Sequence, residues 1–132
     1  MKQAVVRQVN SMHMHCDAVG NVLLAKLACQ DASDCLVIFP AEVVFWMLKN
    51  LPPYRGPALT RPTNLPTIVQ EDWNTSVPRV LSVQCVISHD GFRMTMNLDA
   101  KKNLTAVMSA ATLELMRQLM FAYHEDLFDP SV

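Results

Sequence analysis

Glycine and charge are both scarce in this chain of 132 residues. It holds only three glycines, and 17% of its residues are charged. With so little glycine, the sequence has no P-loop and no dinucleotide-binding fingerprint, because such loops need several glycines to approach a phosphate closely. Eleven basic residues against twelve acidic ones give a net charge of −1. This balance disfavours a protein that binds nucleic acid through its phosphates.

Long hydrophobic runs and paired-cysteine motifs are also missing. No apolar run reaches the roughly eighteen residues of a membrane-spanning helix. Arg7 and Gln8 interrupt the N-terminal apolar residues before a signal-peptide core forms, so we expect a cytoplasmic protein. The four cysteines are Cys16, Cys29, Cys35 and Cys85. None belongs to a C-x-x-C pair, and we expect buried, reduced thiols rather than disulfides or a zinc site.

The C-terminal half has the pattern of three strands followed by a helix. Apolar and polar residues alternate over 80–88, which places Leu81 and Ile87 on the inner face with Val83 and Cys85. Asp90-Gly91 is typical of a hairpin turn, and Ser109 is typical of a helix N-cap. The predicted elements are strands at 80–88, 92–98 and 104–108 and a helix at 110–123.

The N-terminal half repeats this order with little residue identity. Its apolar alternation also changes to a helical pattern, which begins at Pro40. A proline is tolerated at the start of a helix because the N–H that it lacks has no intrahelical partner there. With Gly20 aligned on Gly91, the inward positions of both copies match, which predicts an internal duplication. The predicted elements are strands at 12–16, 23–27 and 35–39 and a helix from Pro40 to about Asn50.

These patterns predict a single domain with an α+β fold, built as two tandem β-β-β-α units with pseudo-twofold symmetry. The units occupy residues 1–51 and 79–132, and we expect an antiparallel sheet with two helices, joined edge to edge or packed face to face. Between them, Pro52–Pro78 contains six of the eight prolines and several large apolar residues. Because a free linker does not need so much apolar area, we expect an ordered proline-rich arm.

The first predicted helix is apolar on almost every face, so it needs cover on more than one side. The proline-rich arm could supply that cover, or the helix could offer a surface to a protein partner or a second copy. A small-molecule pocket lined by Phe45, Trp46 and Met47 is a further alternative. Two outward positions of the second strand are also apolar. The predicted partner-binding residues are Val22, Leu24, Val44, Phe45, Trp46, Leu48 and Trp73.

His13 and His15 are the candidates for a metal site. They lie two residues apart on a predicted strand and therefore face the same side, with Asp17 or His89 as further ligands. The pair could instead make an interface sensitive to pH. Two histidines on an open strand face are more often residues that simply face solvent or an interface.

Nucleophilic catalysis is not predicted. Cys16 directly follows His15, and neighbours on a strand point to opposite faces. Cys85 and His89 are too far apart along a strand for a hydrogen bond. Carboxylates are sparse and form no paired acid and base. We therefore expect neither enzymatic activity nor a cofactor.

The sequence thus predicts a small non-catalytic adaptor or regulatory protein that acts through protein contacts as a homodimer. One alternative is a ligand- or metal-responsive protein that uses His13 and His15. Another is a nucleic-acid-associated factor, although basic residues at helix ends and turns are usually solvated. The residues considered for that third function are Lys49, Tyr54, Arg55, Arg61, Lys101 and Lys102.

Overall fold

The computed structural model describes residues 3–30, 33–52, 77–88, 91–99 and 102–130. Its main elements follow the order β-β-β-α-β-β-β-α. The strands are β1 Gln3–Asp17, β2 Val22–Cys29, β3 Cys35–Pro40, β4 Val80–Ser88, β5 Gly91–Leu98 and β6 Lys102–Met108. The helices are α1 Ala41–Asn50 and α2 Ala110–Tyr123, followed by the short 3-10 helix η2 His124–Asp126.

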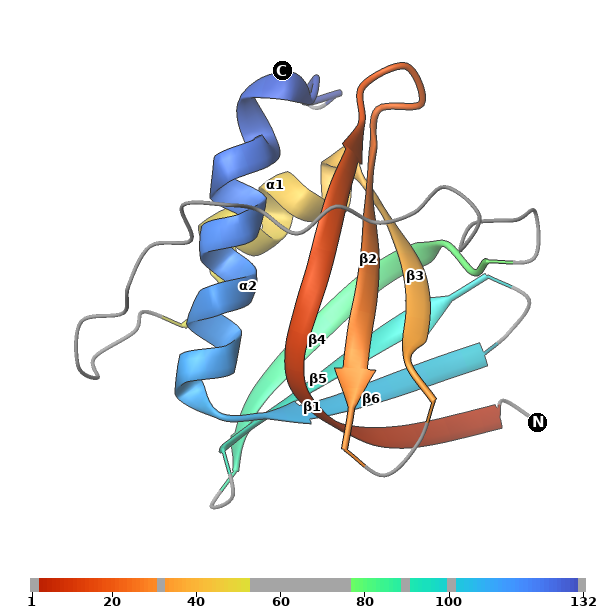
Figure 1. Cartoon of the computed structure of the whole chain (residues 1–132), viewed down its shortest axis with the longest axis vertical. Coiled ribbons are helices and arrows are strands. Elements are labelled where there is room, and N and C mark those ends of the chain that lie inside the picture. Colours follow the sequence, from red (N-terminus) through yellow and green to blue (C-terminus); the bar gives the residue numbers. More distant parts are fainter. Residues whose placement is uncertain (1–2, 31–32, 53–76, 89–90, 100–101, 131–132) are drawn as a thin grey trace.

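The six strands form one sheet in the order β3-β2-β1-β6-β5-β4. Four of the five pairings are antiparallel, but β1 and β6 run parallel. The prediction of an α+β fold with two helices is therefore confirmed, and that of an antiparallel sheet is wrong at this one junction. The reason is the length of β1, which begins at Gln3 rather than near Met12. Its first part lies beside β6, and the strand then bends to pair with β2 (Figure 1).

The sheet curls until its two edge strands approach each other. Ile38 of β3 forms a parallel bridge with Arg79, which directly precedes β4. The Ile38 N–H donates to the carbonyl of Pro78 at 2.9 Å. Both helices lie on the same side of the curled sheet (Figure 1). The core is therefore enclosed between the inner face of the sheet and the two helices.

Local sequence signals account for where the helices and one hairpin begin. The Ser109 side chain accepts a hydrogen bond from the Thr112 N–H at 3.1 Å, as an N-cap of α2 should. Pro40 precedes α1 with φ −60°, and its missing N–H is one that a helix start leaves unpaired. Gly91 has φ +126°, and a Cβ there would lie 2.5 Å from the Met108 carbonyl oxygen. Only glycine fits this position without strain.

Methionine fills much of the core. In the described part of the chain every buried side chain is apolar, and eight of the nine methionines are buried. An unbranched thioether adapts to irregular space, which suits a core between a strongly curled sheet and two helices. The buried methionines are Met12, Met14, Met47, Met94, Met96, Met108, Met116 and Met120.

The start of β4 differs from the predicted alternation. Its pairing with β5 shifts register between Val80 and Ser82, so Leu81 is the extra residue of a bulge and turns outward. Val80 is fully buried, whereas Leu81 is 59% exposed. Ile87, also predicted to face the core, is exposed because it lies near the far end of this edge strand.

Most of the proline-rich segment Pro52–Pro78 lies outside the described residues. The prediction that it is an ordered arm therefore stays a prediction. Neither helix of the described segments combines the length and the apolar character that a membrane span requires.

The bulge in β4 makes a testable contrast between adjacent residues. Val80→Ala removes buried methyl groups, and we expect the free energy of unfolding to fall by about 2 kcal/mol. Leu81→Ala truncates a mostly exposed side chain and should change it by less than about 0.5 kcal/mol. Urea unfolding of both variants measures the difference. A larger loss for Leu81→Ala would mean that Leu81 faces the core and that the bulge is absent.

Candidate functional site

A groove of about 520 Å³ lies between the two helices. Its lining combines residues that are far apart in the sequence, because α1 belongs to the first half of the chain and α2 to the second. We call it the interhelical groove. Its lining residues are Phe45, Leu48 and Lys49 of α1, Glu114, Arg117, Gln118 and Phe121 of α2, and His124 of η2.

Aromatic rings form one end of the interhelical groove. The ring of His124 packs against Phe121 with centroids 4.6 Å apart and meets Phe45 edge-on at 6.2 Å. The His124 Nδ1 atom also forms a short contact with the Phe121 carbonyl. Phe45 and Leu48 are half-buried, whereas Phe121 is 51% exposed. The groove therefore presents an apolar wall with one accessible phenyl ring.

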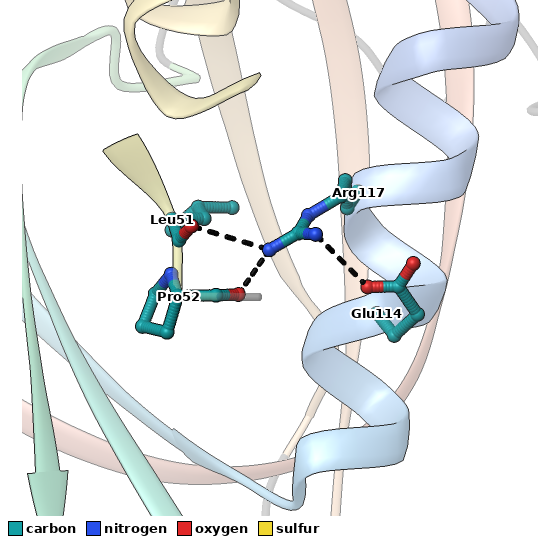
Figure 2. A network of polar contacts seen from close by, with 4 residues as sticks. All are labelled: Leu51, Pro52, Glu114 and Arg117. Atoms are coloured by element: carbon teal, nitrogen blue, oxygen red, sulfur yellow. Dashed lines mark hydrogen bonds and ion pairs between the residues drawn. The ribbon is translucent and has the colours of Figure 1, made fainter. Parts of the chain in front are cut away.

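Arg117 connects α2 to the end of α1 (Figure 2). Its Nη2 atom donates to the carbonyl of Leu51 at 3.2 Å and to the carbonyl of Pro52. Its Nη1 atom lies 3.5 Å from Oε2 of Glu114, one helical turn earlier. The guanidinium thus binds the carbonyl of Leu51, the C-cap of α1, which the helix end leaves without an intrahelical partner, and the carbonyl of the next residue. This link joins the two helices beside the groove that they line.

Three polar atoms on the α2 side of the groove are buried without a hydrogen-bond partner among the described residues. They are Nε of Arg117, Oε1 of Gln118 and Oε2 of Glu114, the last of which makes only the ion pair with Nη1 of Arg117. Buried polar atoms are normally paired, and leaving one unpaired costs about 1–3 kcal/mol. Because each of these atoms is itself covered, a bound group that offers donors and an acceptor would satisfy them once the three side chains rotate toward the groove. The groove is therefore suited to a partly polar occupant, in addition to the apolar contact with Phe45 and Phe121.

The residues predicted to bind a partner are divided among several places. Phe45 and Leu48 line the interhelical groove. Trp46 is 44% exposed and borders a second hollow of about 230 Å³, between α1 and the start of β4. Leu24 is half-buried on β2, opposite His15 of β1 and Ile38 of β3.

Two other predicted residues are buried, and the third lies outside the described residues. Val44 is fully buried and Val22 is only 5% exposed. The prediction that Val22 faces outward is therefore wrong. Val22 begins β2 opposite Asp17 and Pro40 and is enclosed there. Trp73 lies outside the described residues.

The polar face of α2 was missed as part of a site. Glu114, Arg117, Gln118 and Phe121 follow the spacing i, i+3, i+4, i+7, so they share one helix face. A single phenylalanine on an otherwise polar face is the signal that could have identified it. No sequence pattern placed this face opposite Phe45, since that depends on how the helices pack.

The histidine pair lies on an open surface. His13 and His15 are both exposed on β1, opposite Lys26 and Leu24 of β2. Asp17 accepts a hydrogen bond from the Gly20 N–H at 3.2 Å, and His89 is not among the described residues. Within the described part of the chain, no group of three or more His, Cys, Asp or Glu side chains could hold a metal ion.

The cysteines are free thiols, and all four are half-buried rather than fully buried as expected. Burial raises the pKa of the Cys16 thiol, and the carboxylates of Asp126 and Asp17 raise it further. Burial also raises the pKa of Cys85. A thiol with a raised pKa is protonated at neutral pH and is a poor nucleophile. These two residues therefore lack the activation that a catalytic cysteine needs.

The basic residues considered for nucleic acid lie apart where they are described. Lys49 lines the interhelical groove, whereas Lys102 borders a separate hollow of about 220 Å³ with Val5 and Leu104. Tyr54, Arg55, Arg61 and Lys101 are outside the described residues. The described lysines therefore form no common basic surface.

Comparison with protein-family models, with curated proteins and with solved structures finds no match for this chain. The function proposed below therefore rests on the sequence and on the geometry of the described residues.

The Arg117 link should contribute to stability. Arg117→Met removes the donor to two carbonyls at the end of α1, and we expect the free energy of unfolding to fall by about 1–2 kcal/mol. Glu114→Gln removes only a partly exposed ion pair and should cost less than about 0.5 kcal/mol. Urea unfolding of both variants provides the comparison. Equal losses would show that the carbonyl contacts add nothing to stability beyond the ion pair within α2.

Proposed function

We propose that this protein is a non-catalytic adaptor or regulatory protein that binds a peptide segment of a partner protein in the interhelical groove. The observation that carries this proposal is the combination of an apolar wall with unpartnered polar atoms in one groove. A polypeptide matches both, because each residue offers a backbone N–H and a carbonyl, and its side chains supply apolar volume. The groove volume of about 520 Å³ is within the usual range for sites that enclose a small ligand or a few side chains.

The geometry favours a peptide with one large apolar side chain flanked by backbone donors. Phe121, Phe45 and Leu48 would contact the apolar side chain, since aromatic surface dominates the energetics of protein contacts. With their side chains rotated toward the groove, Oε1 of Gln118 and Oε2 of Glu114 would accept N–H groups of the bound chain, and Nε of Arg117 would donate to a carbonyl. These pairings would satisfy the atoms that lack partners in the described structure.

A phage-displayed library of random peptides provides a probe for this site. We expect it to yield peptides with a large apolar residue, whose affinity falls at least about tenfold in Phe121→Ser because the accessible ring is lost. Phe128→Ser is the matched control, since Phe128 is also exposed, at 70%, but does not line the groove. Titration by fluorescence anisotropy measures both variants.

The results for the two variants show whether selected peptides bind in the interhelical groove or elsewhere on the protein. Affinity that is lost in Phe121→Ser and kept in Phe128→Ser supports the groove as the binding site. If no peptide is enriched, or if the enriched peptides bind both variants as tightly as the wild type, the proposed site is wrong.

We also propose that the protein forms a homodimer, through the outer edge of β4. This strand pairs with β5 on one side, and on its other side β3 pairs only with Pro78 and Arg79, which directly precede it, among the described residues. Charged residues and prolines usually protect an edge strand against pairing with another chain. The sequence of β4, VLSVQCVIS, contains neither. Val86 and Ile87 are exposed on it by 58% and 75%. Two such edges can pair antiparallel about a twofold axis, and an uncharged strand does not repel its own copy.

A charged substitution on β4 tests this dimer. Val86→Lys places like charges near the twofold axis and should weaken self-association at least about tenfold. Val6→Lys is the control, because Val6 is 52% exposed but lies on β1, an interior strand of the sheet. Light scattering over a range of concentrations gives the mass. A monomeric wild type, or a dimer that survives Val86→Lys, would exclude this interface.

Finally, we propose that the two halves arose by duplication. The support is that their contacts correspond: each half has two antiparallel hairpin pairings. The two halves also meet at two parallel junctions that correspond to each other. At one, Ile38 of β3 pairs with Arg79 just before β4, and at the other, β6 pairs with β1. In this view the curled sheet has a pseudo-twofold axis along its centre. The cytoplasmic location expected from the sequence stays a prediction.

A further inference from the structure

Two cysteines lie side by side across the hairpin that joins β2 to β3. Cys29 is the last residue of β2, and Cys35 is the first residue of β3. The Cys29 thiol donates to Sγ of Cys35, with the two sulfur atoms 3.5 Å apart. Both side chains are partly exposed, so a small reagent can reach them. The sulfur atoms need only a small displacement to reach the bonded distance of about 2.05 Å.

We infer that Cys29 and Cys35 form a redox-active pair that a small-molecule disulfide, such as oxidised glutathione, converts into an intramolecular disulfide bond. The thiolate of one cysteine attacks a sulfur atom of oxidised glutathione, breaks its S–S bond and releases one glutathione thiolate. The thiolate of the second cysteine then attacks the protein sulfur of the mixed disulfide and releases the second glutathione. Two protein thiols are oxidised, one glutathione disulfide is reduced to two thiols, and the two protons pass to the released thiolates.

The surroundings of the pair set how fast this exchange proceeds. Burial raises the pKa of Cys29 to about 11, and the hydrogen bond to Cys35 adds to this effect, while the positive charge of Arg7 opposes it. Because the thiolate is the reacting form, exchange through Cys29 is slow at neutral pH and accelerates as the pH rises.

The bond would fix the start of β3. This strand is an edge of the sheet, and its Ile38 closes the sheet against Pro78 and Arg79. The inference is independent of the interhelical groove and of the β4 dimer, since neither contains Cys29 or Cys35.

Equilibration of the full chain in buffers of oxidised and reduced glutathione tests the inference. We expect a species that has lost two hydrogen masses, and peptide mapping should place the bond between Cys29 and Cys35. Cys29→Ser and Cys35→Ser should each abolish this species. Cys16→Ser and Cys85→Ser are the matched controls and should leave it unchanged.

Nearness in sequence alone would also favour this bond in an unfolded chain, so the same equilibrium is measured in guanidinium chloride. We expect the equilibrium constant to be at least about tenfold larger for the folded protein, because the fold holds the two sulfur atoms together. An equal or smaller constant for the folded protein overturns the inference. A bond that involves Cys16 or Cys85, or that joins two chains, also overturns it.

Discussion

The double pairing of β1 is the constraint on which the rest of this structure depends. The first part of its fifteen residues pairs parallel with β6, and the second part pairs antiparallel with β2. One continuous strand therefore belongs to both halves of the sheet and must bend between them (Figure 1). The Tyr123 hydroxyl donates to the carbonyl of Met14 at 3.2 Å, which attaches the end of α2 to this strand. The positions of both helices follow from this curvature.

The curvature also explains the composition of the core. A sheet that curls until Ile38 meets Arg79 encloses an irregular space, and flexible methionine side chains fill such a space more readily than branched ones. The two helices then cover the open side together, and their polar contact is concentrated in Arg117. Arg117 contacts both the end of α1 and Glu114, whereas Oε1 of Gln118, a residue that also lines the groove, has no hydrogen-bond partner among the described residues.

The features that could support function all depend on how the elements pair and pack. The interhelical groove needs residues of α1 and α2, which the proline-rich segment separates in the sequence. The closeness of Cys29 and Cys35 depends on the pairing of β2 with β3. The accessibility of the uncharged β4 strand depends on its place at the edge of the sheet. Each feature is therefore invisible to a search for short motifs, which agrees with a sequence that has none of the common catalytic patterns.

The sequence by itself determined most of the elements, because alternation, glycine turns and helix caps act over a few residues. The boundaries of β4 and α2 and the N-cap at Ser109 are examples. Only the tertiary structure decided the early start of β1, the outward turn of Leu81 and the burial of Val22. These depend on which strand lies alongside and on what covers a side chain. The groove was predictable only in part: the apolar excess of the first helix indicated Phe45 and Leu48, but their position opposite Phe121 and Gln118 is fixed by helix packing.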